Sequence, residues 1–317
     1  MAATSPGRLM SGAVGQPLLD LLRCPTCGGP YQRHGDRLQC ACGIVVAVRS
    51  GIPRFVDDDG YVKSFSFEWQ KHARTQLDSA SAVARSERDF QSRLDRPLEW
   101  LNGKLVLDAG CGMGRYAEVA ARYGATVVGL DFSFAIDVAR ANLSGWPNVQ
   151  LVQADLTRPP FARETFDLVY SFGVLHHTPN AEQSFLAAAD LVKPGGVMAM
   201  FVYSSYNKAF VYSSDFWRRL TTKLPYQLLY WLCGASVPLY YLYSLPVIGL
   251  IGKSCLPISM ESDWRWRWLD TFDWYSPRFQ SKHTHAEVAS WFLRAGFDQL
   301  FIGPGEVTML GVRGSDQ

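Results

Sequence analysis

The sequence has little net charge and no apparent export signal. Its 317 residues include 31 lysines and arginines against 29 aspartates and glutamates, for a formal net charge of +2. This balance gives no overall electrostatic attraction to nucleic acid, although a local basic patch remains compatible with it. The N-terminal stretch MAATSPGRLMSGAVGQ lacks the sustained apolar run of a secretory signal. We therefore expect a cytoplasmic protein whose residues 1–17 form a flexible tail.

The chain also lacks a repeat of fixed period, which argues against a repeat architecture. Apolar residues make up 48% and charged residues 19%, an ordinary globular balance. Between residues 104 and 203, short apolar runs alternate with helical patterns, as in βαβ units around a parallel sheet. Strands are predicted at 105–109, 126–130, 149–153, 166–171, 196–203, 297–302 and 307–312, with helices near 115–123, 134–143 and 181–192. A further helix is predicted over THAEVASWFLRAGF, between a Thr284 cap and a Gly296 stop.

Composition divides the rest of the chain into regions. Residues 18–56 hold a cysteine cluster, and residues 57–103 are polar, with helical stretches around Ser81–Phe90. The alternating pattern of 104–203 is interrupted by 204–282, an apolar and aromatic insertion, and resumes over 283–317. We expect one α/β core built from the two outer segments.

A glycine-rich turn follows the first predicted core strand, in LVLDAGCGMGRY. A strand that turns at once into a helix leaves the first N–H groups of the helix unpaired, and glycines let a ligand approach them. A dinucleotide site would have G-x-G-x-x-G, but Gly110, Gly112 and Gly114 give G-x-G-x-G, and Arg115 replaces the third dinucleotide glycine. Asp108 would repel a pyrophosphate, whereas it suits the ammonium group of a methionine moiety.

Two more aspartates end the following strands. Asp131, in VVGLDFS, can accept hydrogen bonds from both ribose hydroxyls, and Asp155, in VQADL, can accept one from an adenine amino group. The PGG stretch at 194–196 is expected to form the turn into the fifth strand. A single aspartate at the end of a strand often only shapes a turn. Here three aspartates occur in order with the glycine turn, which favours a shared ligand.

Together, LDAGCGMGRYAEVAARYGATVVGLDFS, VQADL, FDLVYSFGVLHHTPN and LVKPGG resemble the class I S-adenosylmethionine-dependent methyltransferases. The resemblance covers about a third of the chain. It implies a doubly wound, mostly parallel seven-stranded α/β sheet whose final strand is antiparallel. It also assigns S-adenosylmethionine as cofactor. The implied cofactor residues are Asp108, Gly110, Cys111, Gly112, Gly114, Asp131, Phe132, Asp155, Leu156, Phe172 and Gly173.

The cysteine cluster reads C-x2-C, a hairpin-length spacer, then C-x-C. Four thiolates, from Cys24, Cys27, Cys40 and Cys42, can form a tetrahedral zinc site that stabilises a segment with few apolar residues. The segment resembles the zinc ribbons that precede some bacterial methyltransferase domains, and the small activator subunits of RNA and protein methyltransferases with their GIP motif. The second pair is one residue shorter than usual, so reduced cysteines in a degenerate ribbon are the alternative. His34 is expected to be a solvated hairpin residue.

Methyl transfer from a sulfonium requires an aligned acceptor, and a hydroxyl acceptor needs a base. His176 and His177 follow the fourth core strand, and adjacent residues point in different directions, so at most one should face the acceptor. The alternative for each is a structural histidine bonded to loop backbone. His283 and His285 are expected to be capping or surface residues.

The insertion should determine the acceptor. No charged residue occurs between Lys223 and Lys253, a stretch long enough to cross a bilayer at about 20 residues. Pro225, Pro238 and Pro246 interrupt it, which favours a helical lid. An interfacial surface for lipid-like acceptors, with peripheral membrane contact through 224–252, is the alternative.

Two aromatic stretches flank the predicted pocket. In ESDWRWRWLDTFDWYSPRF, tryptophans alternate with arginines, which predicts a strand; base stacking by these residues is a weaker interpretation. YVKSFSFEWQKHARTQLDS, with alternating Phe65, Phe67 and Trp69, is expected to fold over the cofactor as a lid or to pack as a linker. The candidate acceptor contacts are Tyr203, Tyr206, Asp273, Trp274 and Tyr275.

We expect an enzyme that methylates a small-molecule or lipid-like acceptor at oxygen or nitrogen. RNA is the second acceptor class, because one group of ribosomal-RNA methyltransferases also begins with a zinc ribbon. The low net charge and the apolar insertion disfavour it. A cofactor-binding interaction module without turnover is a further alternative.

Overall fold

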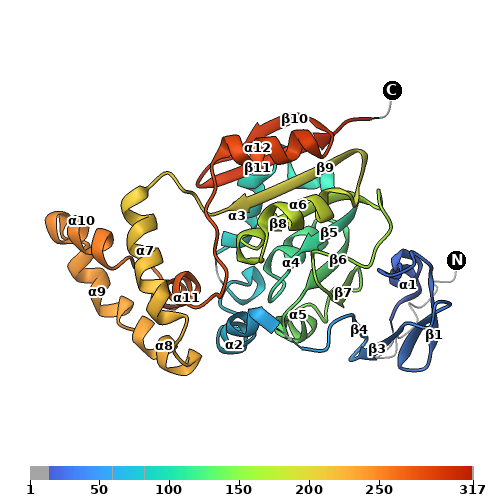
Figure 1. Cartoon of the computed structure of the whole chain (residues 1–317), viewed down its shortest axis with the longest axis horizontal. Coiled ribbons are helices and arrows are strands. Elements are labelled where there is room, and N and C mark those ends of the chain that lie inside the picture. Colours follow the sequence, from blue (N-terminus) through green and yellow to red (C-terminus); the bar gives the residue numbers. More distant parts are fainter. Residues whose placement is uncertain (1–13, 59, 82, 316–317) are drawn as a thin grey trace, which may run out of the picture.

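A single mixed sheet runs through the structure, a computed structural model that describes residues 14–58, 60–81 and 83–315. Residues 1–13 of the predicted tail lie outside that range. The strand order is β1-β2-β3-β4-β7-β6-β5-β8-β9-β11-β10 (Figure 1). The seven core strands are β5 (Leu105–Ala109), β6 (Thr126–Asp131), β7 (Val149–Gln153), β8 (Phe166–Phe172), β9 (Val192–Val202), β10 (Phe297–Ile302) and β11 (Val307–Arg313).

The core strands confirm the predicted seven-stranded arrangement. Strands β7, β6, β5, β8 and β9 pair in parallel, and the final strand β11 runs antiparallel to β9. Buried residues in β5 belong to different clusters: Val106 shares one with Phe90, whereas Leu107 shares the other with Phe185. Helices therefore cover both faces, as expected for a parallel sheet made of apolar runs. One face packs against α3 (Arg85–Arg93), α4 (Arg115–Arg122) and α5 (Ala135–Asn142), and the other against α6 (Ala181–Ala189) and α12 (His285–Arg294).

The N-terminal ribbon extends this sheet. It consists of α1 (Gln16–Leu21), β1 (Tyr31–His34), β2 (Arg37–Cys40), β3 (Val45–Arg49) and β4 (Ile52–Arg54). β4 lies beside β7, where Phe55 N–H donates to the Gln153 carbonyl at 2.8 Å and Arg54 Nη1 donates to Gln153 Oε1 at 2.9 Å. Leu22 and Leu38 share a buried cluster with Val128 of the core. The ribbon is thus packed onto the edge of the core sheet and not tethered loosely (Figure 1, right).

One boundary prediction was wrong. The helix predicted to reach residue 192 ends at Ala189, and the fifth strand begins at Val192, so the PGG stretch lies within β9. Gly195 has φ +72°, and the pairing with β8 shifts register between Phe166 and Leu168. The glycines therefore form an irregularity in the strand and do not form the turn before it.

The insertion is helical, as expected for a lid. Its helices are α7 (Lys208–Thr221), α8 (Tyr226–Cys233), α9 (Ser236–Tyr243), α10 (Pro246–Cys255) and α11 (Trp264–Tyr275). Helices α7 to α10 project from the side of the core opposite the ribbon (Figure 1, left). α11 packs against the other insertion helices and also against α2 (Lys63–Lys71) of the N-terminal region. Within the described ranges, no helix is both long and apolar enough to cross a bilayer.

The strand predicted from the alternating tryptophans is wrong. Residues 264–275 form α11, because the Asp263 carboxylate caps the first turn, accepting hydrogen bonds from the N–H groups of Arg265 and Trp266 at 2.7 and 3.2 Å. The buried positions include Arg267, Thr271 and Tyr275, which follow helical spacing. Capping and burial of this face override the alternation of the tryptophans.

Candidate functional site

A cavity of about 540 Å³ opens at the carboxyl ends of β5, β6 and β8, where ligands bind in open parallel sheets. Its walls come from the β5–α4 turn, the ends of β6 to β9, α2 and α11. The volume is in the range of ordinary ligand sites. The segment that contains α2 and the helix α11 both line it. Following the sequence-based expectations, we call the end at the glycine turn the cofactor end and the end toward α11 the acceptor end.

The glycine turn at the cofactor end needs glycine for two different reasons. At Gly110, φ is +98°, and a Cβ would lie 2.8 Å from Val174 Cβ and overlap with its methyl groups. At Gly114, φ is +93°, and a Cβ would lie 3.0 Å from Leu143 Cγ. Gly110 lines the cavity, whereas Gly114 allows α4 to pack close to the end of α5. The motif thus combines glycines that line the cavity, Gly110 and Gly112, with one packing glycine, Gly114.

Asp131 connects this turn to the end of β6. Its Oδ2 accepts a hydrogen bond from Gly112 N at 2.7 Å, and its Oδ1 accepts from Ser133 N at 2.8 Å and Ser133 Oγ at 2.6 Å. The same carboxyl group lines the cavity. Burial raises the pKa of Asp131, against the hydrogen bonds that stabilise its charged form. It therefore shapes the turn and also faces the cavity.

Asp108 lies behind the turn at the end of the central strand. The residue is 3% exposed, and its Oδ2 has no hydrogen-bond partner among the described residues. Burial raises its pKa to about 8. A buried carboxyl oxygen without a donor is costly, and an ammonium group would remove that cost. Asp108 does not itself line the cavity as it stands.

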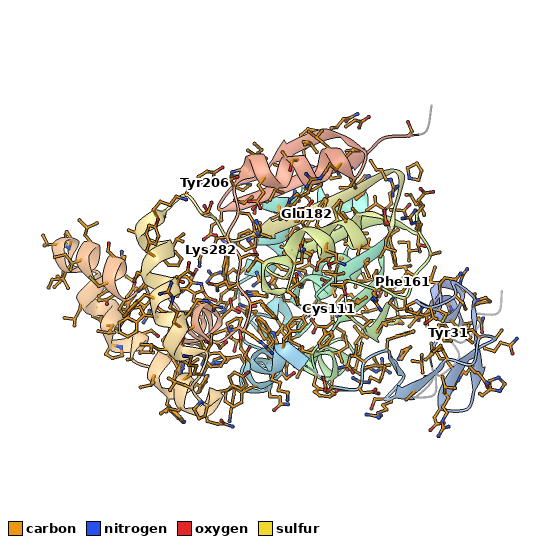
Figure 2. The ribbon with its side chains drawn as sticks, viewed as in Figure 1. Tyr31, Cys111, Phe161, Glu182, Tyr206 and Lys282 are labelled. Atoms are coloured by element: carbon orange, nitrogen blue, oxygen red, sulfur yellow. The ribbon has the colours of Figure 1, made fainter. Side chains whose placement is uncertain are left out.

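The other predicted cofactor residues differ in whether they line the cavity. Most of them line the cavity: Cys111, Gly112, Phe132, Leu156, Phe172 and Gly173. Asp155 does not; its Oδ1 accepts a hydrogen bond from Thr157 N at 2.8 Å and so caps a turn. Burial raises the pKa of the Cys111 thiol well above its ordinary value, which keeps it protonated and unreactive. Cys111 lies at the centre of the molecule (Figure 2).

The N-terminal region covers the cofactor end. Tyr61 stacks on Phe132 with ring centroids 5.2 Å apart, and Trp69 lies 3.4 Å from the position that a Cβ of Gly112 would take. Phe65 and Trp69 line the cavity, but Phe67 packs against Tyr230 of the insertion. Because α2 is a helix, its alternating aromatics face different neighbours.

At the acceptor end, only one histidine of the predicted pair faces the cavity. His177 lines it, with Nδ1 3.1 Å from the Phe279 carbonyl oxygen and Nε2 3.9 Å from Asp273 Oδ1. The Tyr203 hydroxyl donates to Asp273 Oδ2 at 2.7 Å. His176 is fully buried and stacks on Tyr203 at 4.0 Å, outside the cavity. Burial lowers the pKa of His177, although Asp273 opposes this effect.

The remaining predicted acceptor residues separate into two groups. Tyr203, Asp273 and Trp274 line the cavity, but Tyr206 and Tyr275 do not. Tyr206 is 56% exposed on the loop after β9 (Figure 2), and the Tyr275 hydroxyl donates to the Pro257 carbonyl within the insertion.

The expectation that His283 is a capping or surface residue was wrong. The residue is only 7% exposed, contacts Glu287 and Ser281 and packs edge-on against Trp291. Its position before the cap of α12 did not indicate burial, because β9 and the segment 281–283 meet only in the folded chain, where His283 N donates to the Tyr203 carbonyl.

The cavity residues that the sequence interpretation missed include two carboxyl groups, Glu68 and Asp270. Glu68, in FSFEWQK, is 1% exposed. The signal for Asp270 was its spacing from Asp273, since residues three apart share one face of a helix. The sequence interpretation predicted a strand from the alternation at 264–268 and no helix through Asp270 and Asp273, so this relation was not recognised.

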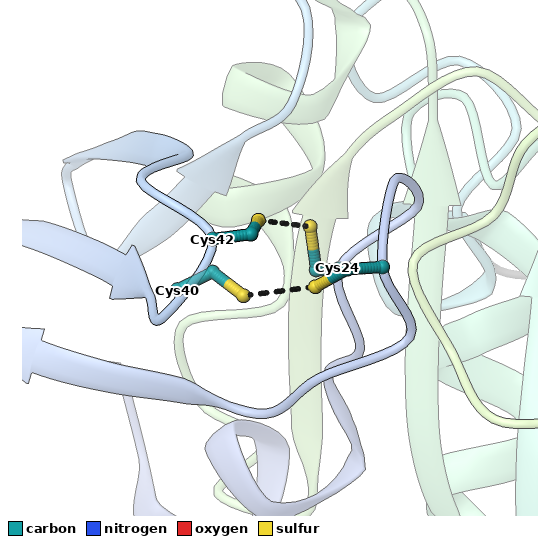
Figure 3. A group of neighbouring side chains, drawn as sticks. Cys24, Cys40 and Cys42 are labelled. Atoms are coloured by element: carbon teal, nitrogen blue, oxygen red, sulfur yellow. Dashed lines mark hydrogen bonds between the residues drawn. The ribbon is translucent and has the colours of Figure 1, made fainter.

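The cysteines converge at the other end of the molecule. The Sγ atoms of Cys24, Cys27, Cys40 and Cys42 all lie within 4.8 Å of one another, with Cys24 3.7 Å from Cys42 and Cys27 3.4 Å from Cys40 (Figure 3). A tetrahedral zinc with zinc–sulfur bonds of about 2.3 Å places sulfurs about 3.8 Å apart. The shortened C-x-C pair therefore fits zinc. His34 is exposed at the end of β1 and is not among these ligands.

Residues 107–200 match a family model described as a methyltransferase domain. The chain is 42% identical over 99 residues to a ubiquinone biosynthesis O-methyltransferase from Salmonella arizonae, covering 30% of this chain and 41% of the relative. It is 32% identical over 120 residues to a tRNA U34 carboxymethyltransferase from Desulfotalea psychrophila, covering 37% of each. The solved magnesium protoporphyrin IX methyltransferase from Synechocystis PCC 6803 superposes with a TM-score of 0.46 at 17% identity, over 82% of this chain and 98% of that one.

The strand order, the glycine turn and the family match define a class I S-adenosylmethionine-dependent methyltransferase domain. The family model covers residues 107–200 of the chain. The chain spans less than half the length of these two curated relatives.

Proposed function

We propose that the chain transfers a methyl group from S-adenosylmethionine to a small-molecule or lipid-like acceptor. The observation that carries this proposal is the pair of buried carboxyl groups beside the glycine turn. Asp108 Oδ2 has no hydrogen-bond donor among the described residues, and the ammonium group of the cofactor would supply one. Asp131 lines the cavity, where it would accept hydrogen bonds from the ribose hydroxyls. Phe132 and Leu156 would enclose the adenine ring.

His177 is proposed as the base that removes the acceptor proton. The Phe279 carbonyl can accept only from a protonated Nδ1, which leaves the lone pair on Nε2. The lowered pKa keeps the ring neutral near pH 7, so it can take a proton. Asp273, 3.9 Å from Nε2, would stabilise the resulting imidazolium. Tyr203 holds Asp273 in place through its hydrogen bond.

One experiment distinguishes a small-molecule or lipid-like acceptor from an RNA acceptor. Purified protein is incubated with methyl-labelled S-adenosylmethionine and fractionated small-molecule, lipid and RNA extracts. Label in the small-molecule or lipid fraction supports the proposal. Label only in RNA would favour the second candidate, which the similarity to the tRNA-modifying relative keeps in consideration. Tight cofactor binding without label anywhere would favour an interaction module.

We also propose that the four ribbon cysteines bind one structural zinc ion. The carrying observation is their convergence within 4.8 Å, which places four thiol groups close together without a disulfide. Elemental analysis should find about one zinc per chain, lost in Cys24→Ser. Cys255→Ser is the matched control, since Cys255 is an exposed cysteine outside the cluster. A metal-free wild-type protein would contradict the proposal.

Finally, we propose that the insertion contacts an anionic bilayer peripherally through 224–252. Trp231, Tyr241 and Leu250 are 70%, 72% and 73% exposed, a combination of aromatic and aliphatic groups that suits a membrane interface. The charged residues from 216 to 260 are all basic, with Lys223 and Lys253 flanking the apolar stretch.

Vesicle co-sedimentation tests this contact. The protein should sediment with vesicles that contain phosphatidylglycerol more than with pure phosphatidylcholine, and Trp231→Ser/Leu250→Ser should reduce sedimentation. Leu293→Ser is the control, because Leu293 is 61% exposed but lies on α12. Equal sedimentation of the double variant, or self-association without vesicle binding, would rule the proposal out.

A further inference from the structure

Three carboxyl groups meet at the acceptor end of the cavity. Glu68 comes from α2, and Asp270 and Asp273 come from successive turns of α11; all three line the cavity. We propose that this carboxyl cluster binds a positively charged amino group of the acceptor. The inference deepens the proposed methyl transfer, on which its interpretation as acceptor recognition rests.

Glu68 is the clearest member of the cluster. It is 1% exposed, and its Oε2 has no hydrogen-bond partner among the residues that the structure describes. Burial raises its pKa, and the nearby charges of Asp273 and Asp270 raise it further. A buried carboxyl oxygen without a donor, directed into a ligand cavity, indicates that the ligand supplies the donor.

The cluster lacks a basic partner from the protein. Within the described part of the chain, neither Glu68 nor Asp270 forms an ion pair, and the only ion-pair contact of Asp273 is His177. Two other carboxyls of the same cavity are paired with arginines: Asp89 with Arg93 and Arg115, and Glu261 with Arg85. Asp131 and Glu306 instead accept hydrogen bonds from backbone N–H groups. The distribution of arginines therefore leaves the three carboxyl groups of the cluster without a guanidinium partner.

Nearby basic groups are already engaged elsewhere. The Arg218 guanidinium donates to the carbonyls of Trp274 and Pro277, and Arg115 Nη1 donates to Gln76 Oε1. Lys282 pairs with Asp215. His72, which also lies near α11, has its pKa lowered by burial to about 4 and is neutral. Lys63 and Lys71 of α2 and Arg265 of α11 form no ion pair among the described residues, but none of them lines the cavity. The arginines that do line it, Arg85, Arg93 and Arg115, pair with other carboxyl groups.

Aromatic rings complete the site. Phe65 lies with its ring centroid 5.1 Å from that of His177, and Trp274 lines the same cavity. Aromatic faces attract ammonium groups, particularly where water is excluded. Carboxylates beside an amine stabilise its protonated form, which is a poor nucleophile. The amino group is thus an anchor, and the methylated atom is a different nucleophile that faces His177.

The ligand test uses two probes of the same shape, 2-phenylethylamine and 2-phenylethanol. Binding of each is measured by calorimetry to protein saturated with S-adenosylhomocysteine. We expect the wild type to bind the amine at least about tenfold more tightly than the alcohol, since a charged hydrogen bond contributes about 1.5–3 kcal/mol. Glu68→Gln and Asp270→Asn should abolish that preference. Equal binding of both probes, or a preference that survives in both variants, would overturn the proposal.

Thermal unfolding gives an independent readout that needs no ligand. A carboxyl whose pKa is raised on folding binds more protons in the folded state, so stability falls as pH rises from its ordinary value of 4.5 through the raised value. Glu68→Gln should therefore raise the unfolding midpoint at pH 8, with a smaller gain at pH 5. Glu118→Gln is the control: Glu118 is also 1% exposed but pairs with Arg122, so its loss should lower the midpoint.

The two readouts separate this inference from the proposed function. If wild-type protein fails to bind S-adenosylhomocysteine, the methyltransferase proposal fails, whereas the pH-dependent gain of Glu68→Gln still tests the cluster. A Glu68→Gln variant that is less stable than wild type at pH 8, like the control, would show that Glu68 is a structural residue and would overturn the carboxyl cluster as a ligand site.

Discussion

The cofactor end and the acceptor end of one cavity are built in different ways. At the cofactor end, a short continuous motif supplies backbone groups and the carboxyl of Asp131, which accepts three hydrogen bonds from Gly112 and Ser133. At the acceptor end, side chains come from four separate segments, and Glu68 has an oxygen without any partner. The two ends therefore differ in origin: one comes from contiguous residues, and the other from segments that are far apart in the sequence.

The largest effect at the acceptor end is expected from a substitution of His177. Replacing it with glutamine should reduce the rate of methyl transfer by about 10²–10⁴-fold, as expected for loss of a general base, with cofactor affinity unchanged. Single-turnover transfer of label to the reactive extract fraction measures the rate, and calorimetry measures the affinity. A His177→Gln variant with full activity would assign the histidine a structural role. His176→Gln is a poor control, because it is fully buried.

The corresponding test at the cofactor end is the substitution Asp131→Ala. Loss of two charged hydrogen bonds to ribose should weaken S-adenosylmethionine binding by about 100-fold, on the basis of at least 1.5 kcal/mol for each. The variant also loses the bond to Gly112, which adds to the effect. Asp36→Ala, at an 87% exposed side chain of the ribbon, is the control. Unchanged affinity in calorimetry would exclude Asp131 as the ribose ligand.

Proton release on cofactor binding tests the protonation state of Asp108 at the cofactor end. With a pKa of about 8, Asp108 is protonated in the free protein near pH 6.5. Pairing with the cofactor ammonium favours the charged form, so binding should release up to about one proton. Calorimetry in two buffers of different ionisation enthalpy measures this number. Asp108→Asn should release none from this position; release equal to that of wild type would assign the proton to another group.

The smallest effect is expected for Tyr203→Phe. The hydroxyl donates to Asp273 and positions it without lying in the proposed path of the proton. A net contribution of about 1 kcal/mol for such a bond corresponds to a rate change of roughly fivefold. The pH dependence of the rate should shift as well, since Asp273 is then free to interact more strongly with His177. A rate and a pH profile identical to those of wild type would exclude a positioning role for Tyr203.

Much of the core was predictable from sequence, for a physical reason. Apolar runs that are buried on both faces are typical of parallel strands under helices, and the predicted strands at 105–109 and 149–153 agree with the structure. The glycines of the turn were recognisable because positive φ and close approach exclude other residues at Gly110 and Gly114. Requirements of this kind depend on residues that are close together in the sequence.

The acceptor end was predicted less well. Alternating tryptophans and arginines at 264–268 suggested a strand, but the Asp263 cap and the buried face of α11 outweighed the alternation. The helix that brings Asp270 and Asp273 onto one face was therefore not predicted. Glu68 stood in an aromatic stretch whose neighbours in space, on α11, are about 200 residues away in sequence. Only the folded chain shows that its carboxyl group faces theirs.

The sequence by itself determined the parallel core, the glycine turn and the spacing of four cysteines, because each depends on neighbouring residues or on a simple period. Tertiary structure alone decided which of two adjacent histidines faces the cavity and that the ribbon joins the sheet at β7. It also decided which carboxyl groups lack partners. Burial and charge pairing are properties of surroundings, and the surroundings of Glu68 and His177 are assembled from segments that come together only on folding.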